Sequence, residues 1–138
     1  MDDEEFNLLD ADYFVMVEYG NYSIGEVKLN IKKFIEMVKE IGDFPILTDF
    51  DGMYMTYGEQ EPEPLIKECK ELLHKIDPSP DLNEMLGKSP DEIKENKGYL
   101  SHISRFPQEK QKLILGTLAI LYVAEGAIKT GSIVRVEE

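Results

Sequence analysis

The chain has 138 residues, 42% of them hydrophobic, a single cysteine and a formal net charge of −13. These values are typical of one globular domain in a reducing compartment, and they exclude an intramolecular disulfide. The acidic N-terminus does not fit a signal peptide and no uncharged segment is long enough to span a bilayer, so we expect a cytoplasmic protein without membrane contact.

A β-hairpin is predicted near the N-terminus. Residues 1–12 look like a frayed acidic lead-in, and a single domain is expected over residues 13–138. Residues 13–19 are rich in aromatic and β-branched side chains, which is typical of a strand. Gly20 and Asn21 supply a turn, and residues 22–29 return as the second strand. Apolar residues on both faces leave open which face meets the core.

A first helix is predicted over residues 31–41. Asn30 is a good N-cap, and apolar residues recur at helical spacing with charged residues between them. Gly42 fits the position just beyond a helix C-terminus. This is the clearest helical pattern in the chain.

A second hairpin is predicted over residues 46–57. An apolar run at residues 46–48 leads into Asp49-Phe50-Asp51-Gly52. If Asp51 and Gly52 form a type I′ turn, the flanking residues pair across it as two strands. The resulting hairpin has one strongly apolar face and one more polar face. That agreement favours a turn over a ligand site at the two aspartates.

Two further long helices and a final strand complete the chain. The second helix ends before Pro78 and has an apolar stripe that includes Cys69. Residues 77–106 are expected to form short helices and loops, with a helix start at residues 89–92. The third helix runs from about Pro107 to Lys129, and its middle is apolar nearly all round, which predicts the buried centre of the domain. Residues 132–137 alternate like a strand at a sheet edge.

These elements together predict an α+β fold. It consists of an antiparallel sheet from two β-hairpins plus a C-terminal edge strand, packed against three longer helices with a central apolar C-terminal helix. No internal repeat and no linker divides residues 13–138.

The run around Asp49 and Asp51 also resembles the first motif of the haloacid dehalogenase superfamily of phosphotransferases. The resemblance implies Asp49 as a nucleophile at a strand end, Asp51 as an acid/base and magnesium as the neutralising ion. It covers only the residues around the two aspartates, Met53 stands where the family usually has threonine, and no later strand ends in a phosphate-binding Ser or Thr. A small magnesium-dependent phosphate-handling enzyme is therefore the alternative function.

Other catalytic and metal sites find little support in the sequence. A calcium loop with Gly52 at its sixth position would begin at Leu47 and end at Gly58, where carboxylates are needed. His74 and His102 have no partner at metal-ligand spacing, and Cys69 is interpreted as a core residue. We therefore assign no catalytic residue, no metal ion and no cofactor.

Acidic residues are concentrated in the first part of the chain. Residues 1–63 hold 16 acids and 4 bases, whereas residues 64–138 hold 12 acids and 11 bases. Such a field repels nucleic acid and attracts a basic protein, and tyrosines among carboxylates supply contact area with a hydrogen-bonding tip. The six residues predicted to contact the partner are Glu18, Tyr19, Tyr22, Asp49, Asp51 and Tyr54.

The favoured function is a non-enzymatic acidic protein-binding module that docks on a basic partner surface. Inhibitors, immunity proteins and antitoxins commonly have this size and charge. The alternative interpretation of the charge is that the surplus acid only keeps the protein soluble. The sequence leaves the identity of the partner and the oligomeric state open.

Overall fold

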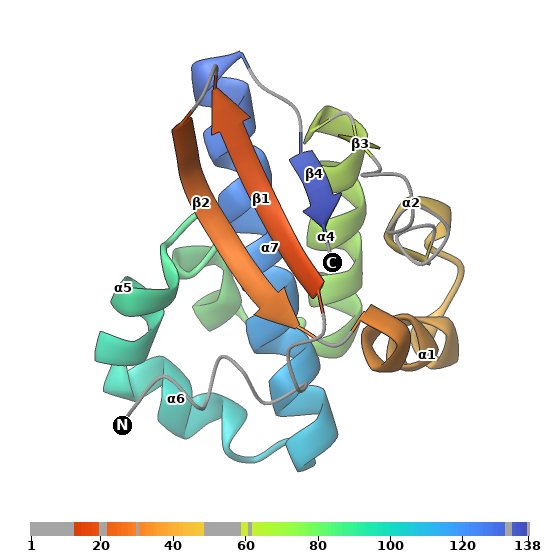
Figure 1. The fold of residues 1–138 in the computed structure, drawn as a ribbon. Helices are drawn as coiled ribbons and strands as arrows, with labels where there is room; N and C mark the ends of the chain where they lie inside the picture. The colour runs from red at the N-terminus through yellow and green to blue at the C-terminus, as the bar shows by residue number, and fades with distance from the viewer. Residues whose placement is uncertain are drawn as a thin grey trace.

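The computed structural model describes residues 13–19, 22–29, 31–48, 59–60, 62–131 and 134–137, with side chains described for residues 33–48 and 62–131. In chain order the elements are β1 (Tyr13–Tyr19), β2 (Tyr22–Leu29), α1 (Ile31–Ile41), α2 (Pro45–Thr48), β3 (Glu59–Gln60), α4 (Pro62–Ile76), the 3₁₀ helix η3 (Pro80–Glu84), α5 (Pro90–Glu95), α6 (Lys97–Ile103), α7 (Gln108–Thr130) and β4 (Val134–Glu137). In Figure 1, α7 runs through the middle of the molecule with α4 beside it.

The hydrophobic core surrounds α7. Every residue from 113 to 121 is buried, and α4 lies along this helix with its apolar stripe turned inward. The other helices each add a few side chains. The fully buried members of the core outside α7 include Phe34, Val38, Leu47, Leu65, Cys69, Leu72, Leu73, Leu82 and Ile93. The predicted role of the third long helix as the apolar centre is therefore confirmed for the described residues.

The length and composition of α7 would also suit a membrane-spanning helix. Within its most apolar window, however, 67% of the residues are buried inside the protein. The core helix of a folded domain has the same profile as a spanning helix, because both are apolar nearly all round. Burial by α4, by strands β1 and β2 and by the shorter helices accounts for the apolar character of α7.

The three long helices begin and end close to where their sequence signals lie. Helix α1 has the predicted bounds, and α4 ends at Ile76, before Pro78. Helix α7 ends at Thr130 and is capped by Gly131, whose φ of 68° is the left-handed conformation that glycine adopts readily at a helix C-terminus. Helix α5 has the predicted capping box, in which Ser89 Oγ accepts from the Glu92 N–H at 3.2 Å and Glu92 Oε1 accepts from the Ser89 N–H at 3.1 Å.

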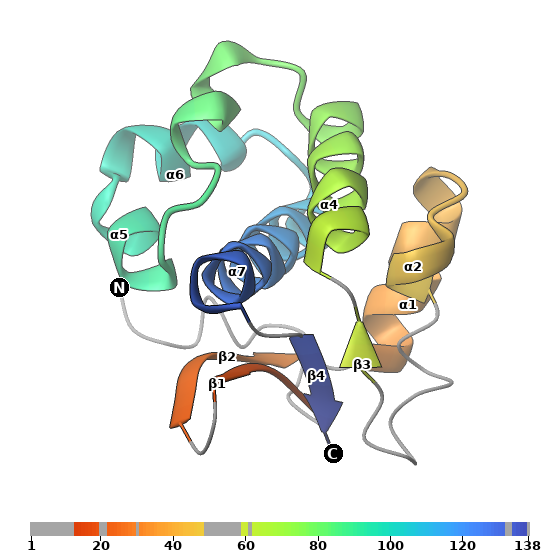
Figure 2. The same cartoon turned by 90° about the horizontal axis from the view of Figure 1, so that it is seen from above.

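The described backbone also contains four strands in a layer on one side of α7, seen below it in Figure 2. They pair antiparallel in the order β2-β1-β4-β3. Strands β1 and β2 pair from Tyr13↔Leu29 to Tyr19↔Tyr22, with a register shift between Val17 and Glu18. Strand β4 pairs with both β1 and β3, so the prediction that the last strand lies at the sheet edge is wrong.

The predicted fold class, an α+β domain built on a sheet of two hairpins, is wrong for the part of the chain whose side chains are described, residues 33–48 and 62–131. Every core residue in this part lies in a helix or in a connection between helices, so this part is all-α. The predicted second hairpin fails at its start, because residues 45–48 form α2 and β3 is only 2 residues long. A short apolar run fits a buried helical turn as well as a strand, so its pattern alone was ambiguous.

Candidate functional site

The six predicted partner-binding residues fall into two groups. Glu18, Tyr19 and Tyr22 lie at the turn end of β1 and β2, where the backbone register pairs Tyr19 with Tyr22 and Glu18 with Ser23. The structure thus brings their backbone positions together at one end of the hairpin. The other three predicted residues, Asp49, Asp51 and Tyr54, lie outside the described residues, and their place in a shared surface stays a prediction.

The residues just before Asp49 form a helical turn that is fixed by Glu68 of α4. The Glu68 side chain is only 9% exposed. Its Oε1 accepts hydrogen bonds from the backbone N–H groups of Ile46 and Leu47, both at 3.0 Å, and its Oε2 accepts from Ile46 at 3.1 Å. The first N–H groups of a helix have no partners within the helix, so this carboxylate stabilises α2 by satisfying them.

This helical turn bears on the alternative function. The resemblance to the haloacid dehalogenase superfamily implies a strand that ends in the nucleophile Asp49. In the structure, the residues leading to Asp49 are Pro45–Thr48 of α2, and Thr48 Oγ1 donates to the Phe44 carbonyl at 3.0 Å, as a helical residue does. The strand on which that resemblance depends is therefore absent from the described residues before the motif.

A buried polar cluster that the sequence did not predict lies where α4, η3 and α6 meet. We define the Asp77 cluster as Asp77, Ser79, Asp81, Tyr99 and His102. The Asp77 residue is 1% exposed. Its carboxylate accepts from the Tyr99 hydroxyl at 3.2 Å, and its two oxygens lie 3.0 and 3.1 Å from His102 Nε2. The Ser79 backbone N–H also donates to Asp77 Oδ1, at 3.2 Å.

The environment fixes the protonation of two members of the Asp77 cluster. Burial acts to raise the pKa of Asp77, but hydrogen bonds from His102 and Ser79 outweigh it and hold this pKa below its ordinary value. Burial, followed by the negative charge of Asp77, raises the pKa of Tyr99. At neutral pH the cluster therefore contains an ionised carboxylate that accepts a hydrogen bond from a protonated phenol.

The Asp77 cluster holds a serine, a histidine and an aspartate, but not in the arrangement of a catalytic triad. In a triad the nucleophile and the carboxylate bind opposite nitrogens of the imidazole, so that one nitrogen moves the proton while the other is held. Here Ser79 Oγ lies 3.1 Å from His102 Nε2, the same nitrogen that faces Asp77. Because Nε2 is already engaged by a carboxylate, it cannot act as the base for Ser79. The cluster is a structural junction between helices.

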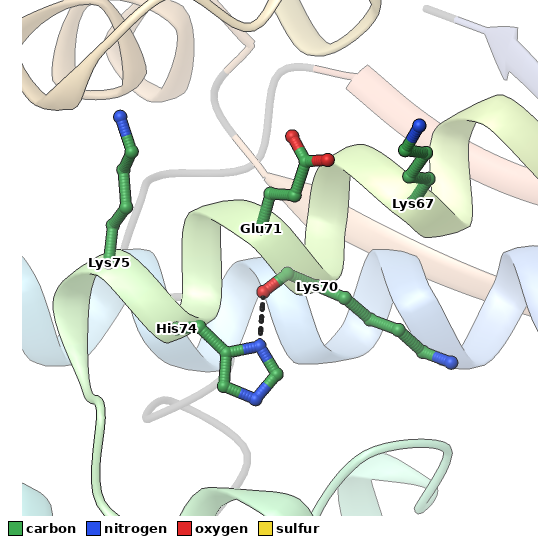
Figure 3. Close-up of a pocket in the computed structure, with 5 residues that line it drawn as sticks. All are labelled: Lys67, Lys70, Glu71, His74 and Lys75. Carbon is green, nitrogen blue, oxygen red and sulfur yellow. Dashed lines mark hydrogen bonds between the residues drawn. The ribbon is translucent and has the colours of Figure 1, made fainter.

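A shallow hollow lies on the outer face of α4. Its volume is about 490 Å³, and it is lined by Lys67, Lys70, Glu71, His74 and Lys75. Figure 3 shows Lys67, Glu71 and Lys75 on one side of the helix axis and Lys70 and His74 on the other. The spacing of Lys67, Glu71 and Lys75 is that of i,i+4 charge pairs on a solvated helix.

Partners within the protein occupy most of the polar groups around this hollow. Lys70 Nζ lies 3.9 Å from Glu125 Oε1, and Lys75 Nζ lies 5.4 Å from the centre of the Phe44 ring. His74 Nδ1 lies 2.8 Å from the Lys70 carbonyl oxygen, and its Nε2 lies 3.0 Å from Asn83 Oδ1. The hollow is therefore a solvated helix surface, with alternating charges and local partners.

The described part of the chain offers little for a metal ion or a nucleophile. Across residues 33–48 and 62–131, no group of three or more His, Cys, Asp and Glu side chains is placed to hold a metal. Cys69 is fully buried, and burial, with nearby carboxylates, raises the pKa of its thiol. The prediction that Cys69 is a core residue is confirmed, and its thiol is inert by position.

Comparison of the chain with protein-family models, with curated proteins and with solved structures gave no match.

Proposed function

We propose that the protein is a non-catalytic binding module whose acidic N-terminal segment, residues 1–63, docks on a basic surface of another protein. The observation that carries this proposal is the charge of the segment, with 16 acids against 4 bases. An excess of carboxylates attracts cationic surfaces, speeds their encounter at low ionic strength and repels nucleic acid. A partner class that fits is a basic enzyme or toxin, which the module would inhibit in the manner of an immunity protein or antitoxin.

The described side chains of this segment support its availability to a partner. Helix α1 buries Phe34 and Val38 in the core, whereas Glu36 and Glu40 are exposed on it. Asp43, in the connection that follows, is exposed as well. Exposed carboxylates keep their hydration until a partner arrives, so they contribute to long-range attraction without a folding penalty.

Tyrosines at the end of the N-terminal hairpin are the second feature that supports binding. Tyr19 and Tyr22 are direct neighbours in the register of β1 and β2, next to Glu18. Tyrosines supply contact area and hydrogen-bonding tips, and the carboxylates of the acidic segment supply negative charge, a combination that suits a lysine- or arginine-rich partner surface.

The proposal is tested by capture of partners from a cytosolic extract with the immobilised protein. Three immobilised forms are compared at low and high ionic strength: wild type, the variant Glu18→Gln/Asp49→Asn/Asp51→Asn, and a control that removes the same number of charges elsewhere, Glu84→Gln/Glu95→Gln/Glu109→Gln. The three control residues are exposed. We expect a basic protein to bind wild type and control at low salt, and to be lost at high salt and with the first variant.

Two results would contradict the proposal. One is capture that is insensitive to salt. The other is equal loss of the captured protein with both variants, because general acidity rather than the predicted surface would then be responsible.

A further inference from the structure

We propose that the Asp77 cluster is a pH-sensitive lock, which holds α6 against the end of α4 and η3 more firmly when His102 is protonated. This inference does not depend on the proposed binding function. It rests on the position of His102 between two carboxylates that come from other segments of the chain.

His102 projects from α6 toward groups on both neighbouring segments. Asp77, just after α4, lies against Nε2, and Asp81 of η3 places Oδ2 at 3.8 Å from Nδ1. Tyr99, one turn earlier on α6, has its ring centre 5.8 Å from that of His102. The ring of Phe106 meets the imidazole edge-on, at 5.9 Å between centres. Among the described side chains, the titratable groups that face His102 are therefore two carboxyls and one phenol.

Hydrogen-bond chemistry sets the role of each ring nitrogen. Because Nε2 faces the ionised carboxylate of Asp77, it must carry a hydrogen and donate it. In the neutral ring, Nδ1 then has a lone pair directed toward the Asp81 carboxylate, which gives no attraction. Protonation places an N–H group and a positive charge at Nδ1, so both carboxylates then attract the ring.

Partial burial limits the screening of the attraction between His102 and Asp77, whereas Asp81 is 62% exposed and contributes a weaker, screened attraction. The side chain of His102 is 20% exposed, and that of Asp77 is 1% exposed. Charges in such a setting interact more strongly than exposed pairs. The pKa of Asp77 lies below its ordinary value, so this carboxylate stays charged throughout the range in which a histidine titrates.

Helix α6 is the element whose attachment should change when His102 gains or loses a proton. Among the described elements, α5 is the one that packs most closely against α6. The other anchors of α6 are the buried side chains of Tyr99 and Ile103 and the polar contacts of the Asp77 cluster. At higher pH the neutral imidazole keeps its Nε2–H bond to Asp77 but loses the charge attraction to Asp77 and Asp81, so local opening of α6 becomes more frequent.

The test is amide hydrogen exchange of the full chain at about pH 5.5 and about pH 7.5, corrected for intrinsic exchange rates. For wild type we expect the protection of the α6 amides to be about threefold to tenfold higher at the lower pH, with little change in the centre of α7. His102→Gln should abolish this difference. His74→Gln is the matched control because it removes the other histidine of the chain, which is exposed on α4, and it should leave the difference intact.

A third variant covers the case in which His102→Gln fails to fold. Asp81 is 62% exposed, so Asp81→Asn leaves the buried contacts in place and should reduce the pH difference in α6. The proposal is overturned if wild type shows no pH difference in α6, if His102→Gln retains it, or if Asp81→Asn leaves it unchanged.

Discussion

The carboxylate of Glu68 accepts a hydrogen bond from the backbone N–H of Leu47 at 3.0 Å, across 21 positions of the sequence. The same carboxylate holds the N–H of Ile46, so one side chain of α4 satisfies the exposed donors at the start of α2. A buried carboxylate is unfavourable unless it is hydrogen-bonded, and these donors offset that penalty. The contact therefore fixes residues 45–48 as a helical turn packed on α4.

Replacement of Glu68 with Gln should lower the free energy of unfolding by about 1–3 kcal/mol, because an amide nitrogen in place of Oε2 would face the Ile46 N–H, donor against donor, and the lost charge would weaken the bonds that Oε1 accepts. Urea unfolding followed by circular dichroism measures the change. Glu71→Gln is the matched control on the exposed face of the same helix and should change stability by less than about 0.5 kcal/mol. Equal losses for the two variants would mean that Glu68 does not anchor α2.

The Glu68 contact also shows why part of the fold could not be predicted from the sequence. Helices α1, α4 and α7 were predictable because their apolar periodicity and their end signals, such as Gly42, Pro78 and Gly131, are local. The conformation of residues 45–48 depends on a carboxylate more than twenty positions later, which no local sequence pattern contains. Sequence reasoning therefore assigned a strand to a segment that tertiary contacts hold as a helix.

The Asp77 cluster was missed for the same reason. His102 and Asp77 are 25 positions apart, and Tyr99 is 22 positions from Asp77. The sequence shows no partner for His102 at the spacing of a metal site. Sequence spacing does not reveal hydrogen-bond partners that lie far apart in the chain. The available signal was weak: an aspartate directly after a helix, followed by Pro78 and Pro80, marks a chain reversal whose polar groups need partners.

Asp77 should stabilise the protein at neutral pH and lose this effect in acid. Burial opposes its ionisation, yet the bonds from His102 and Ser79 leave its pKa below the ordinary value. A carboxyl with a lowered pKa binds fewer protons in the folded state, so its contribution is present above about pH 4 and is lost as the pH falls through its folded pKa.

Asp77→Asn removes that titration. The free energy of unfolding should fall by about 1–3 kcal/mol near neutral pH, and the difference from wild type should shrink as the pH is lowered below about 4. Denaturant titrations at a series of pH values measure both quantities. A difference that stays constant down to the lowest pH would show that the Asp77 charge makes no contribution.

Cys69 should not react in the native protein. Its side chain is fully buried in α4, and burial raises the pKa of its thiol, so little thiolate forms at neutral pH. Labelling with a thiol reagent such as DTNB should be slow in buffer and rapid in denaturant, with the native rate limited by opening of the core. Rapid stoichiometric labelling of the folded protein would contradict the burial of Cys69.

Three glycines offer a graded test of backbone conformation. Gly87 and Gly131 have φ values of 84° and 68°, where a side chain is strained, whereas Gly98 lies within α6 without a positive φ. A Cβ at Gly87 would also come within 2.5 Å of Glu125 Oε2, the end of a flexible side chain that can move aside. A Cβ at Gly131 would meet no atom of the described residues within 4 Å apart from its chain neighbours, so the backbone strain is what the substitution tests there.

We therefore expect Gly87→Ala and Gly131→Ala each to lower the free energy of unfolding by about 1–2 kcal/mol, whereas Gly98→Ala should raise it by about 0.5–1 kcal/mol. The loss of unfolding free energy should be larger for Gly87→Ala than for Gly131→Ala by only about a few tenths of a kcal/mol. When Glu125 moves aside, the contact it loses among the described residues is a partly exposed ion pair with Lys70, and such pairs contribute little. Thermal and urea unfolding of the three variants measure the order. A large excess loss at Gly87 would mean that Glu125 is held in place by contacts stronger than the pair with Lys70.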